Sequence, residues 1–313
     1  MKIKNQNFVS AVIYVHNAEA HIGRFLLTII HTLEENFEHS EIICVNDGSD
    51  DSSAAELRKT ALRASAASIS MVNMSYYHGL EAAMNAGLDL AIGDFVFEFD
   101  NTVLDFDESD IMRIYERSLQ GYDIVSASPN RKGRLSSKLF YSVFTRFTNS
   151  PYHMTTESFR ILSRRVINRI SSMNKTVPYR KAVYSNTGFK MDNIVYDVLP
   201  DAAGAFGSRK ESRYRVGLAI DAMILFTEIG YRFSITMTLM MMAVSVFMVG
   251  YSVVTYMTSH PVAGWTTTIL FLSVAFSGLF GILTVVIKYL QLLVNLIFKR
   301  KQYIFESIEK LTK

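Results

Sequence analysis

The chain has 313 residues, of which 49% are hydrophobic, and its formal net charge is +3. This length allows one large domain or two ordinary ones, with ample apolar side chains for a core. The small net charge conceals an asymmetry, because residues 1–130 carry 8 Lys and Arg against 20 Asp and Glu, whereas residues 131–215 carry 17 against 5. Such a basic segment suits anionic headgroups, a phosphorylated lipid or nucleic acid, and the apolar segments that follow it argue against nucleic acid.

Two segments near the C-terminus, 233–257 and 266–287, contain no charged residue. Each is long enough to cross a bilayer, which takes about 20 apolar residues. Buried core helices are the alternative, but two such segments separated by a short polar gap favour membrane spans. The loop 258–265 has no Lys or Arg, so the positive-inside rule predicts an integral membrane protein with both ends in the cytosol. The flanking cations are Arg213, Arg215, Arg232, Lys288, Lys299, Arg300 and Lys301.

The N-terminal stretch 1–7 is polar and leads directly into an apolar segment, so we expect no signal peptide and a cytosolic first domain. Cys44 lies in an apolar segment, which predicts a reduced core thiol with no disulfide or zinc role. The domain is expected to end near residue 207. Amphipathic helices at the membrane surface are expected over 208–232, and an amphipathic cytosolic tail over 288–313.

Apolar segments of strand type alternate with segments of helical periodicity through residues 8–100. This alternation predicts an α/β domain with a mostly parallel sheet. Neither Gly-x-Gly-x-x-Gly nor Gly-Lys-Ser/Thr occurs, which argues against a dinucleotide dehydrogenase and a P-loop enzyme. The expected strands are 8–15, 41–45, 69–73 and 93–100, and the expected helices are 22–33, 52–65 and 80–91.

Beyond residue 100 the pattern predicts a helix over 108–119 and a strand over 123–127. The basic stretch 131–134 precedes a helix expected over 135–147. The segment 184–196 reads as a further strand.

Two of the expected strands end in carboxylates. The strand 93–100 ends in Asp100, and open α/β sheets bind ligands at the edge formed by the carboxyl ends of their strands. The second strand runs into the loop 46–52, which combines a glycine turn with residues that cap helix N-termini, so that backbone N–H groups and a carboxylate meet. We therefore expect the ligand site at this edge.

Several motifs follow one another in a fixed order. They are Val-Ile-Tyr-Val-His-Asn at 12–17, Val-Asn-Asp-Gly-Ser-Asp-Asp-Ser at 45–52, His-Gly-Leu-Glu-Ala-Ala-Met-Asn-Ala-Gly-Leu at 78–88, Gly-Asp-Phe-Val-Phe-Glu-Phe-Asp at 93–100 and Ser-Phe-Arg-Ile-Leu-Ser-Arg-Arg at 158–165. With the two apolar segments, they resemble the family 2 glycosyltransferases, in particular the polyprenyl-phosphate branch that includes dolichyl-phosphate mannose synthase. The resemblance covers essentially the whole chain and implies a GT-A fold.

This resemblance implies inverting transfer of a sugar from a nucleotide-sugar, with a UDP-sugar favoured, to a polyprenyl phosphate. In a bacterium the acceptor would be undecaprenyl phosphate and the membrane would be the inner membrane. The product would be a lipid-linked sugar donor for the glycosylation of cell-surface polysaccharide. Assembly as a homo-oligomer is a further expectation, by analogy alone.

The resemblance also implies a donor site. By position, Asp47 would hold the base of the nucleotide, and Asn17, Glu19 and Gly79 would line the same pocket. Asp100 would stand at the start of the family's Asp-x-Asp motif, where it would bind Mg²⁺ or Mn²⁺ and the donor. A carboxylate suits this task because Mg²⁺ is often held by one or two carboxylates together with substrate phosphates.

The acceptor phosphate would meet Arg160, Ser163 and Arg164, with Arg131 in a basic loop that assists them. Asp100, Arg131 and Arg160 are therefore the residues expected to be catalytic. A phosphate monoester has a second pKa near 6, so the acceptor is already a nucleophilic dianion and needs no histidine base. The site must instead supply positive charge, and arginine matches phosphate oxygens with two parallel hydrogen bonds.

The sequence departs from the family pattern in several places. Thr102 stands where the second metal-site aspartate is usual, Asn46 replaces an aspartate beside Asp47, and Tyr14 and His16 replace Pro and Tyr. The Asp-x-Gly-Asp expected before Phe-Arg is replaced by Thr155-Thr156-Glu157-Ser158. Glu98, Asp105 and Glu157 are the carboxylates considered as substitutes for the missing ligand.

These departures leave a second hypothesis open, in which a catalytically weakened relative serves as a nucleotide-sugar or lipid-binding subunit. A processive polysaccharide synthase is a third alternative. It is disfavoured because two spans offer too little for a conducting channel and because no Gln-x-x-Arg-Trp occurs, the sole tryptophan being Trp265.

Overall fold

A computed structural model describes residues 4–130, 157–172, 179–186, 188–199 and 303–312, together with scattered helical positions between 236 and 293. The chain divides into two compact units. One comprises residues 1–218 and 299–313, and the other comprises residues 219–298.

The described residues form an eight-stranded sheet in the order β7-β5-β6-β4-β1-β2-β3-β8. Parallel pairing joins β4, β1, β2 and β3, and also β5 and β7, whereas β6 and β8 run antiparallel to their neighbours. The predicted mostly parallel α/β sheet is therefore confirmed. The strands are β1 (Val9–Val15), β2 (Ser40–Asn46), β3 (Ser68–Met74), β4 (Phe95–Phe99), β5 (Ile124–Pro129), β6 (Phe159–Ser163), β7 (Met191–Tyr196) and β8 (Phe305–Lys310).

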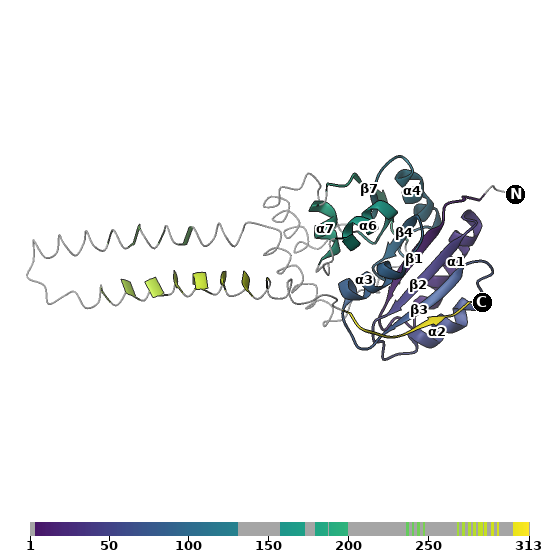
Figure 1. The fold of residues 1–313 in the computed structure, drawn as a ribbon, viewed down its shortest axis with the longest axis horizontal. Helices are drawn as coiled ribbons and strands as arrows, with labels where there is room; N and C mark the ends of the chain where they lie inside the picture. The colour runs from purple at the N-terminus through teal and green to yellow at the C-terminus, as the bar shows by residue number, and fades with distance from the viewer. Residues whose placement is uncertain are drawn as a thin grey trace, which may run out of the picture. The chain divides into compact units, whose positions relative to one another are not determined.

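Helices pack on both faces of the sheet (Figure 1). Side chains alternate along a strand, so Ala11 and Ile13 of β1 join one core cluster while Val12 and Tyr14 join the other. The first cluster includes side chains of α1 (Ile22–Asn36), α2 (Ser53–Ala61) and α4 (Glu108–Ser118). The second includes side chains of α3 (Leu80–Leu90), α6 (Arg164–Ser172) and α7 (Arg180–Asn186).

Cys44 lies in the first cluster as a buried free thiol, as predicted, and burial raises its pKa to about 12. The prediction of a strand over 184–196 was wrong in its first part. Residues up to 186 belong to α7, and the strand begins at Met191. The reason lies in tertiary contacts, because Arg180 and Tyr184, four residues apart on one helical face, both reach buried Glu98.

The last strand corrects the predicted domain boundary. The tail 288–313 was expected to lie outside a domain ending at residue 207, but β8 pairs antiparallel with β3 and belongs to the first unit. Without β8, β3 would be an unpaired edge strand, which proteins usually cover. Figure 1 shows this yellow strand lying along β3.

Several other predictions fall wholly or largely on residues outside those described. These are the amphipathic helices over 208–232, most of the two apolar segments, and the helix over 135–147. Within the part of the chain that is described, no helix combines the length and apolarity needed to cross a membrane.

Gly87 in α3 allows this helix to lie close to the sheet. A Cβ atom at Gly87 would stand 2.4 Å from Val12 Cγ1 and 2.8 Å from Val45 Cγ2. These branched side chains are buried and cannot swing away, so we expect Gly87→Ala to lower the free energy of unfolding by about 1–3 kcal/mol. Urea unfolding of the purified chain would measure the change.

The matched control is Gly23→Ala in α1, where the new Cβ meets only the flexible side chain of Glu56. Alanine favours a helix over glycine, so this variant should be as stable as the wild type or slightly more stable. Equal stability of Gly87→Ala and Gly23→Ala would contradict the close packing of α3.

Candidate functional site

Asp47 follows β2 at the carboxyl edge of the sheet and is fully buried. Its carboxylate accepts hydrogen bonds from the Tyr14 hydroxyl at 3.1 Å, the His78 backbone N–H at 2.7 Å and the Gly79 backbone N–H at 2.8 Å. Gly79 has φ +89°, a conformation that favours glycine, and it caps the N-terminus of α3. Asp47 therefore ties β1, β2 and the start of α3 together at one point.

Asn17 and Glu19, the other predicted donor residues, hold the loop that follows Asp47. Asn17 Oδ1 accepts from the Asp50 N–H at 2.8 Å, and Glu19 Oε2 accepts from the Ser52 N–H at 3.0 Å. The structure thus brings Asp47, Asn17, Glu19 and Gly79 to one edge of the sheet, as expected. The described contacts of Asn17 and Glu19 hold the loop 46–52 in place.

A hollow of about 580 Å³ opens at the carboxyl ends of β2 and β3, and we call it the β2–β3 hollow. Its walls come from His16, from the segments 48–50 and 73–77, and from β8. Aromatic rings and amide groups line it together. Most of the lining is polar, and the aromatic rings of Tyr76, Tyr77 and His16 add flat surfaces to it.

Arg160 lies at the centre of a second group of side chains, which we call the ionic cluster: Glu81, Glu98, Asp100, Glu157, Arg160 and Arg180. Nη1 of Arg160 lies 2.6 Å from Glu98 Oε2, and Nη2 lies 2.7 Å from Asp100 Oδ2. Nε lies 3.1 Å from Glu157 Oε2. Arg160 is 0% exposed, and each of its described ion pairs is with a protein carboxylate.

Arg180 enters the ionic cluster from α7. Its Nε lies 2.9 Å from Glu81 Oε2, its Nη1 lies 2.9 Å from Glu98 Oε1, and its Nη2 lies 2.7 Å from Asp100 Oδ1. The Tyr184 hydroxyl donates to the same oxygen of Glu98 at 3.1 Å. The two arginines therefore hold Asp100 by one oxygen each.

The charges of the ionic cluster decide the state of Asp100. Burial alone would raise the pKa of Asp100, but the guanidinium groups of Arg160 and Arg180 outweigh burial and hold this pKa well below its usual range. The pKa of Arg180 is raised, since the attraction of Glu81, Glu98 and Asp100 exceeds the cost of burial. Asp100 is therefore a carboxylate at any physiological pH.

The predicted acceptor residues do not form one group in the structure. β6 runs antiparallel to β4, so Arg160 pairs with Glu98 near the carboxyl end of β4, whereas Ser163 pairs with Phe95 at its other end. Arg164 donates to the Gly93 carbonyl oxygen from Nε at 2.9 Å. Ser163 and Arg164 therefore lie at the opposite edge from Asp100, and their expected place beside Arg160 was wrong. Arg131 lies outside the described residues.

Sequence reasoning missed Arg180, Glu81 and Tyr184. Glu81 lies in the motif at 78–88 but was given no role there, and no motif marks Arg180 or Tyr184. The three side chains reach the site from two different helices. One signal was available, because Glu98 and Asp100 lie two residues apart on the same face of a strand expected to be buried. Two buried carboxylates need cations, and the basic segment 131–215 was the place to look for them.

The residues around Asp100 also limit how a divalent cation could bind. Both Asp100 oxygens accept from arginine, and buried Thr102 holds the position of the second carboxylate. Glu98 and Glu157 pair with Arg160, and Asp105 accepts from a tyrosine hydroxyl. Among the described residues, no group of three or more His, Cys, Asp or Glu side chains could hold a metal ion. These residues fit a cation only if the phosphates of a bound nucleotide supply its other ligands.

Comparison with solved structures identifies the fold. A mannosyltransferase of Pyrobaculum calidifontis, PcManGT, solved with GDP-Man and Mn²⁺, is similar with a TM-score of 0.50 and 14% identity over 70% of this chain and 63% of that chain. Glucosyl-3-phosphoglycerate synthase of Mycobacterium tuberculosis, solved with phosphoglyceric acid, matches with a TM-score of 0.50 and 13% identity over 70% and 78% of the two chains. These likenesses concern the fold alone, and they agree with the predicted GT-A fold.

Proteins with similar sequences include several glycosyltransferases. An uncharacterized glycosyltransferase of Synechocystis sp., sll0501, is 30% identical over 63% of each chain. The prophage bactoprenol glucosyl transferase homolog of Escherichia coli is 31% identical over 60% of this chain and 62% of its own. The undecaprenyl-phosphate 4-deoxy-4-formamido-L-arabinose transferase of Aeromonas hydrophila is 33% identical over 37% and 35%. In each case the match spans less than two thirds of the relative.

The fold and the sequence relatives agree with one class of proteins, the glycosyltransferases. The model of glycosyl transferase family 2 matches residues 10–171, and the chain belongs to this family. The predicted family is thereby confirmed, and the names of the relatives agree with the predicted polyprenyl-phosphate branch.

Proposed function

We propose that this enzyme transfers a sugar from a nucleotide-sugar, with a UDP-sugar favoured, to a polyprenyl phosphate with inversion at the anomeric carbon. The observation that carries the proposal is that three features lie at one edge of a family 2 domain: the loop 46–52, which we call the Asp47 loop, the β2–β3 hollow, and Asp100. The printed names of the bactoprenol and undecaprenyl-phosphate transferases support the acceptor class. The product would be a lipid-linked sugar donor for cell-surface glycosylation.

In the proposed reaction, a phosphate oxygen of the acceptor forms a bond to the anomeric carbon as the bond to the nucleoside diphosphate breaks. The acceptor is already a dianion near neutral pH, so no side chain has to remove a proton from it. Asp47 holds the start of α3 and the rim of the hollow in place. The arginines of the ionic cluster hold Asp100 charged and fixed at the edge where the donor binds.

The proposal includes attachment to a membrane, because a polyprenyl phosphate is a membrane lipid. The uncharged segments 233–257 and 266–287 would form two spans, with the catalytic domain and both termini in the cytosol. The basic charge of residues 131–215 would favour contact with anionic headgroups. Assembly as a homo-oligomer stays part of the proposal by analogy.

One observation favours a second candidate function. Thr102 replaces a carboxylate, and both oxygens of Asp100 are taken by arginine. A chain of this kind could bind a nucleotide-sugar or lipid as a subunit without turning it over.

Transfer of labelled sugar from a panel of UDP- and GDP-sugars to undecaprenyl phosphate in detergent tests the main proposal. We expect transfer from at least one donor, and loss of transfer in Asp100→Asn. Nucleotide binding without transfer from any donor would favour the binding subunit. Retained turnover in Asp100→Asn would remove Asp100 from the proposed catalytic residues.

Mg²⁺ or Mn²⁺ belongs to the proposal because PcManGT was solved with Mn²⁺ and GDP-Man. Since Asp100 alone is a poor site, we expect the full-length protein to bind little Mn²⁺ by itself and about one ion when a UDP-sugar is added. The electron paramagnetic resonance signal of free Mn²⁺ measures this binding. Asp100→Asn should lose the Mn²⁺ binding that depends on nucleotide. Tight Mn²⁺ binding by the wild type without nucleotide would contradict the prediction.

A further inference from the structure

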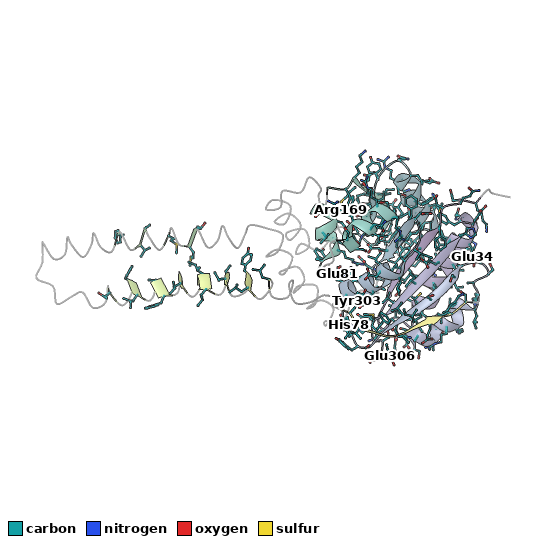
Figure 2. The ribbon with its side chains drawn as sticks, in the orientation of Figure 1. Glu34, His78, Glu81, Arg169, Tyr303 and Glu306 are labelled. Carbon is teal, nitrogen blue, oxygen red and sulfur yellow. The ribbon has the colours of Figure 1, made fainter. Side chains whose placement is uncertain are left out.

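We infer that β8 is part of the donor site and forms one wall of the β2–β3 hollow, which holds the nucleoside of a nucleoside-diphosphate sugar. The inference rests on the proposed function and adds to it the strand β8 (Phe305–Lys310), to which the family resemblance assigns no role. This segment follows the second unit in the chain and returns to the first. Figure 2 shows His78, Tyr303 and Glu306 at the same end of the domain.

β8 is fastened to the sheet by side chains as well as by backbone pairing with β3. Arg58 of α2 donates to both oxygens of Glu309, at 3.0 Å from Nε and 2.9 Å from Nη2. Asn73 Nδ2 donates to Glu309 at 2.8 Å and to Ser307 at 3.1 Å. Arg58, Asn73, Ser307 and Glu309 all line the hollow, so the contacts that fix β8 also fix the wall.

The start of β8 is also connected to the Asp47 loop. The Ile304 N–H donates to Nε2 of the His78 ring at 3.1 Å, and the backbone N–H of His78 donates to Asp47 Oδ1 at 2.7 Å. The Tyr303 hydroxyl donates to Asp89 of α3. One histidine thus links the C-terminal segment to the carboxylate at the centre of the proposed donor site.

The rings in and beside the hollow suit a nucleobase. The His16 and Tyr77 rings lie 4.6 Å apart at an interplanar angle of 49°, and Tyr76 stacks on His78 with their centroids 4.0 Å apart. A flat base stacks on such rings, and neighbouring amides such as Asn46 can hydrogen-bond its edge.

The charges around the hollow decide which part of the donor it takes. Asp50, Glu306 and Glu309 contribute three carboxylates, whereas Arg58, the one arginine among the described lining residues, is paired with Glu309. This excess of negative charge repels the diphosphate and favours the uncharged nucleoside. Glu306 is exposed on β8, where its carboxylate can accept a hydrogen bond from a ribose hydroxyl or a base N–H.

Nucleotide binding to the full-length protein in detergent tests the inference, with UDP and GDP as probes in isothermal titration calorimetry. We expect Glu306→Ala to raise the Kd of the preferred nucleotide about tenfold, the loss of one hydrogen bond to a charged group. The matched control is Glu116→Ala, an exposed glutamate of α4 outside the hollow, which should bind like the wild type.

Hydrogen exchange gives a second measurement that needs no variant. Bound nucleotide should slow amide exchange in 303–312 as well as in the Asp47 loop. Protection of the Asp47 loop alone, together with an unchanged Kd in Glu306→Ala, would overturn the inference and leave the proposed function standing. Absence of nucleotide binding to the wild type would overturn both.

Discussion

Arg180→Ala is expected to destabilise the catalytic domain by about 3–5 kcal/mol and to abolish sugar transfer. Removing one partner of a buried ion pair leaves the other charge unpaired in a medium that solvates it poorly. Here one substitution removes a fully buried cation from three carboxylates, Glu81, Glu98 and Asp100. Asp100 also loses one of the two groups that fix its position, so activity falls even in the molecules that fold.

Urea unfolding and transfer assays measure the two effects separately. Arg180→Lys keeps the charge but cannot donate in three directions from one plane, so it should recover part of the stability and little of the activity. Arg169→Ala, an exposed arginine of α6, is the matched control and should behave like the wild type. Wild-type stability in Arg180→Ala would mean that the ionic cluster is not formed as described.

The same cluster predicts a pH dependence of stability. The pKa of Asp100 is lower in the folded protein than in the unfolded chain, where an aspartate titrates near pH 3.9. Its contribution to stability is therefore complete above about pH 4 and is lost only as the pH falls toward the depressed folded value. A step in stability between pH 5 and 8 that disappears in Asp100→Asn would contradict this assignment.

Asp47→Ala is expected to abolish nucleotide binding and to lower the free energy of unfolding by about 2–4 kcal/mol. The substitution removes the acceptor of the His78 and Gly79 backbone N–H groups in a buried place, together with one partner of the Tyr14 hydroxyl. An unsatisfied buried donor costs about 1–3 kcal/mol, and the loop around the three donors can relax in part. The start of α3 and the rim of the β2–β3 hollow would then lose their common anchor.

Calorimetry with UDP and GDP and urea unfolding measure these two effects. Asp47→Asn keeps the shape but replaces one acceptor oxygen by a donor NH₂ group, so its stability should lie between those of the wild type and Asp47→Ala. Asp197→Ala removes an exposed aspartate that accepts one surface hydrogen bond, from Asn130, and should change little. Wild-type nucleotide affinity in Asp47→Ala would place the donor elsewhere.

The alternation of strands and helices, the family, and the place of Asp47 and Asp100 at the carboxyl edge could all be predicted from the residue pattern. These features depend on nearby residues. The spacing of apolar residues distinguishes strands from helices, and a loop that follows a parallel strand must lie at the carboxyl edge of the sheet. The motif at 45–52 could therefore be read without any knowledge of distant contacts.

The cations that contact Asp100 and the residues that line the β2–β3 hollow could not be predicted in this way, because they come from distant parts of the chain. Arg180 lies 80 positions from Asp100, and Glu309 lies 251 positions from Arg58. No local period encodes contacts across such separations. The direction of β6 is decided in the same way, since antiparallel pairing with β4 carries Ser163 and Arg164 away from Arg160. Burial makes the contact between Arg180 and Asp100 obligatory, because a carboxylate removed from water needs a cation to stay charged.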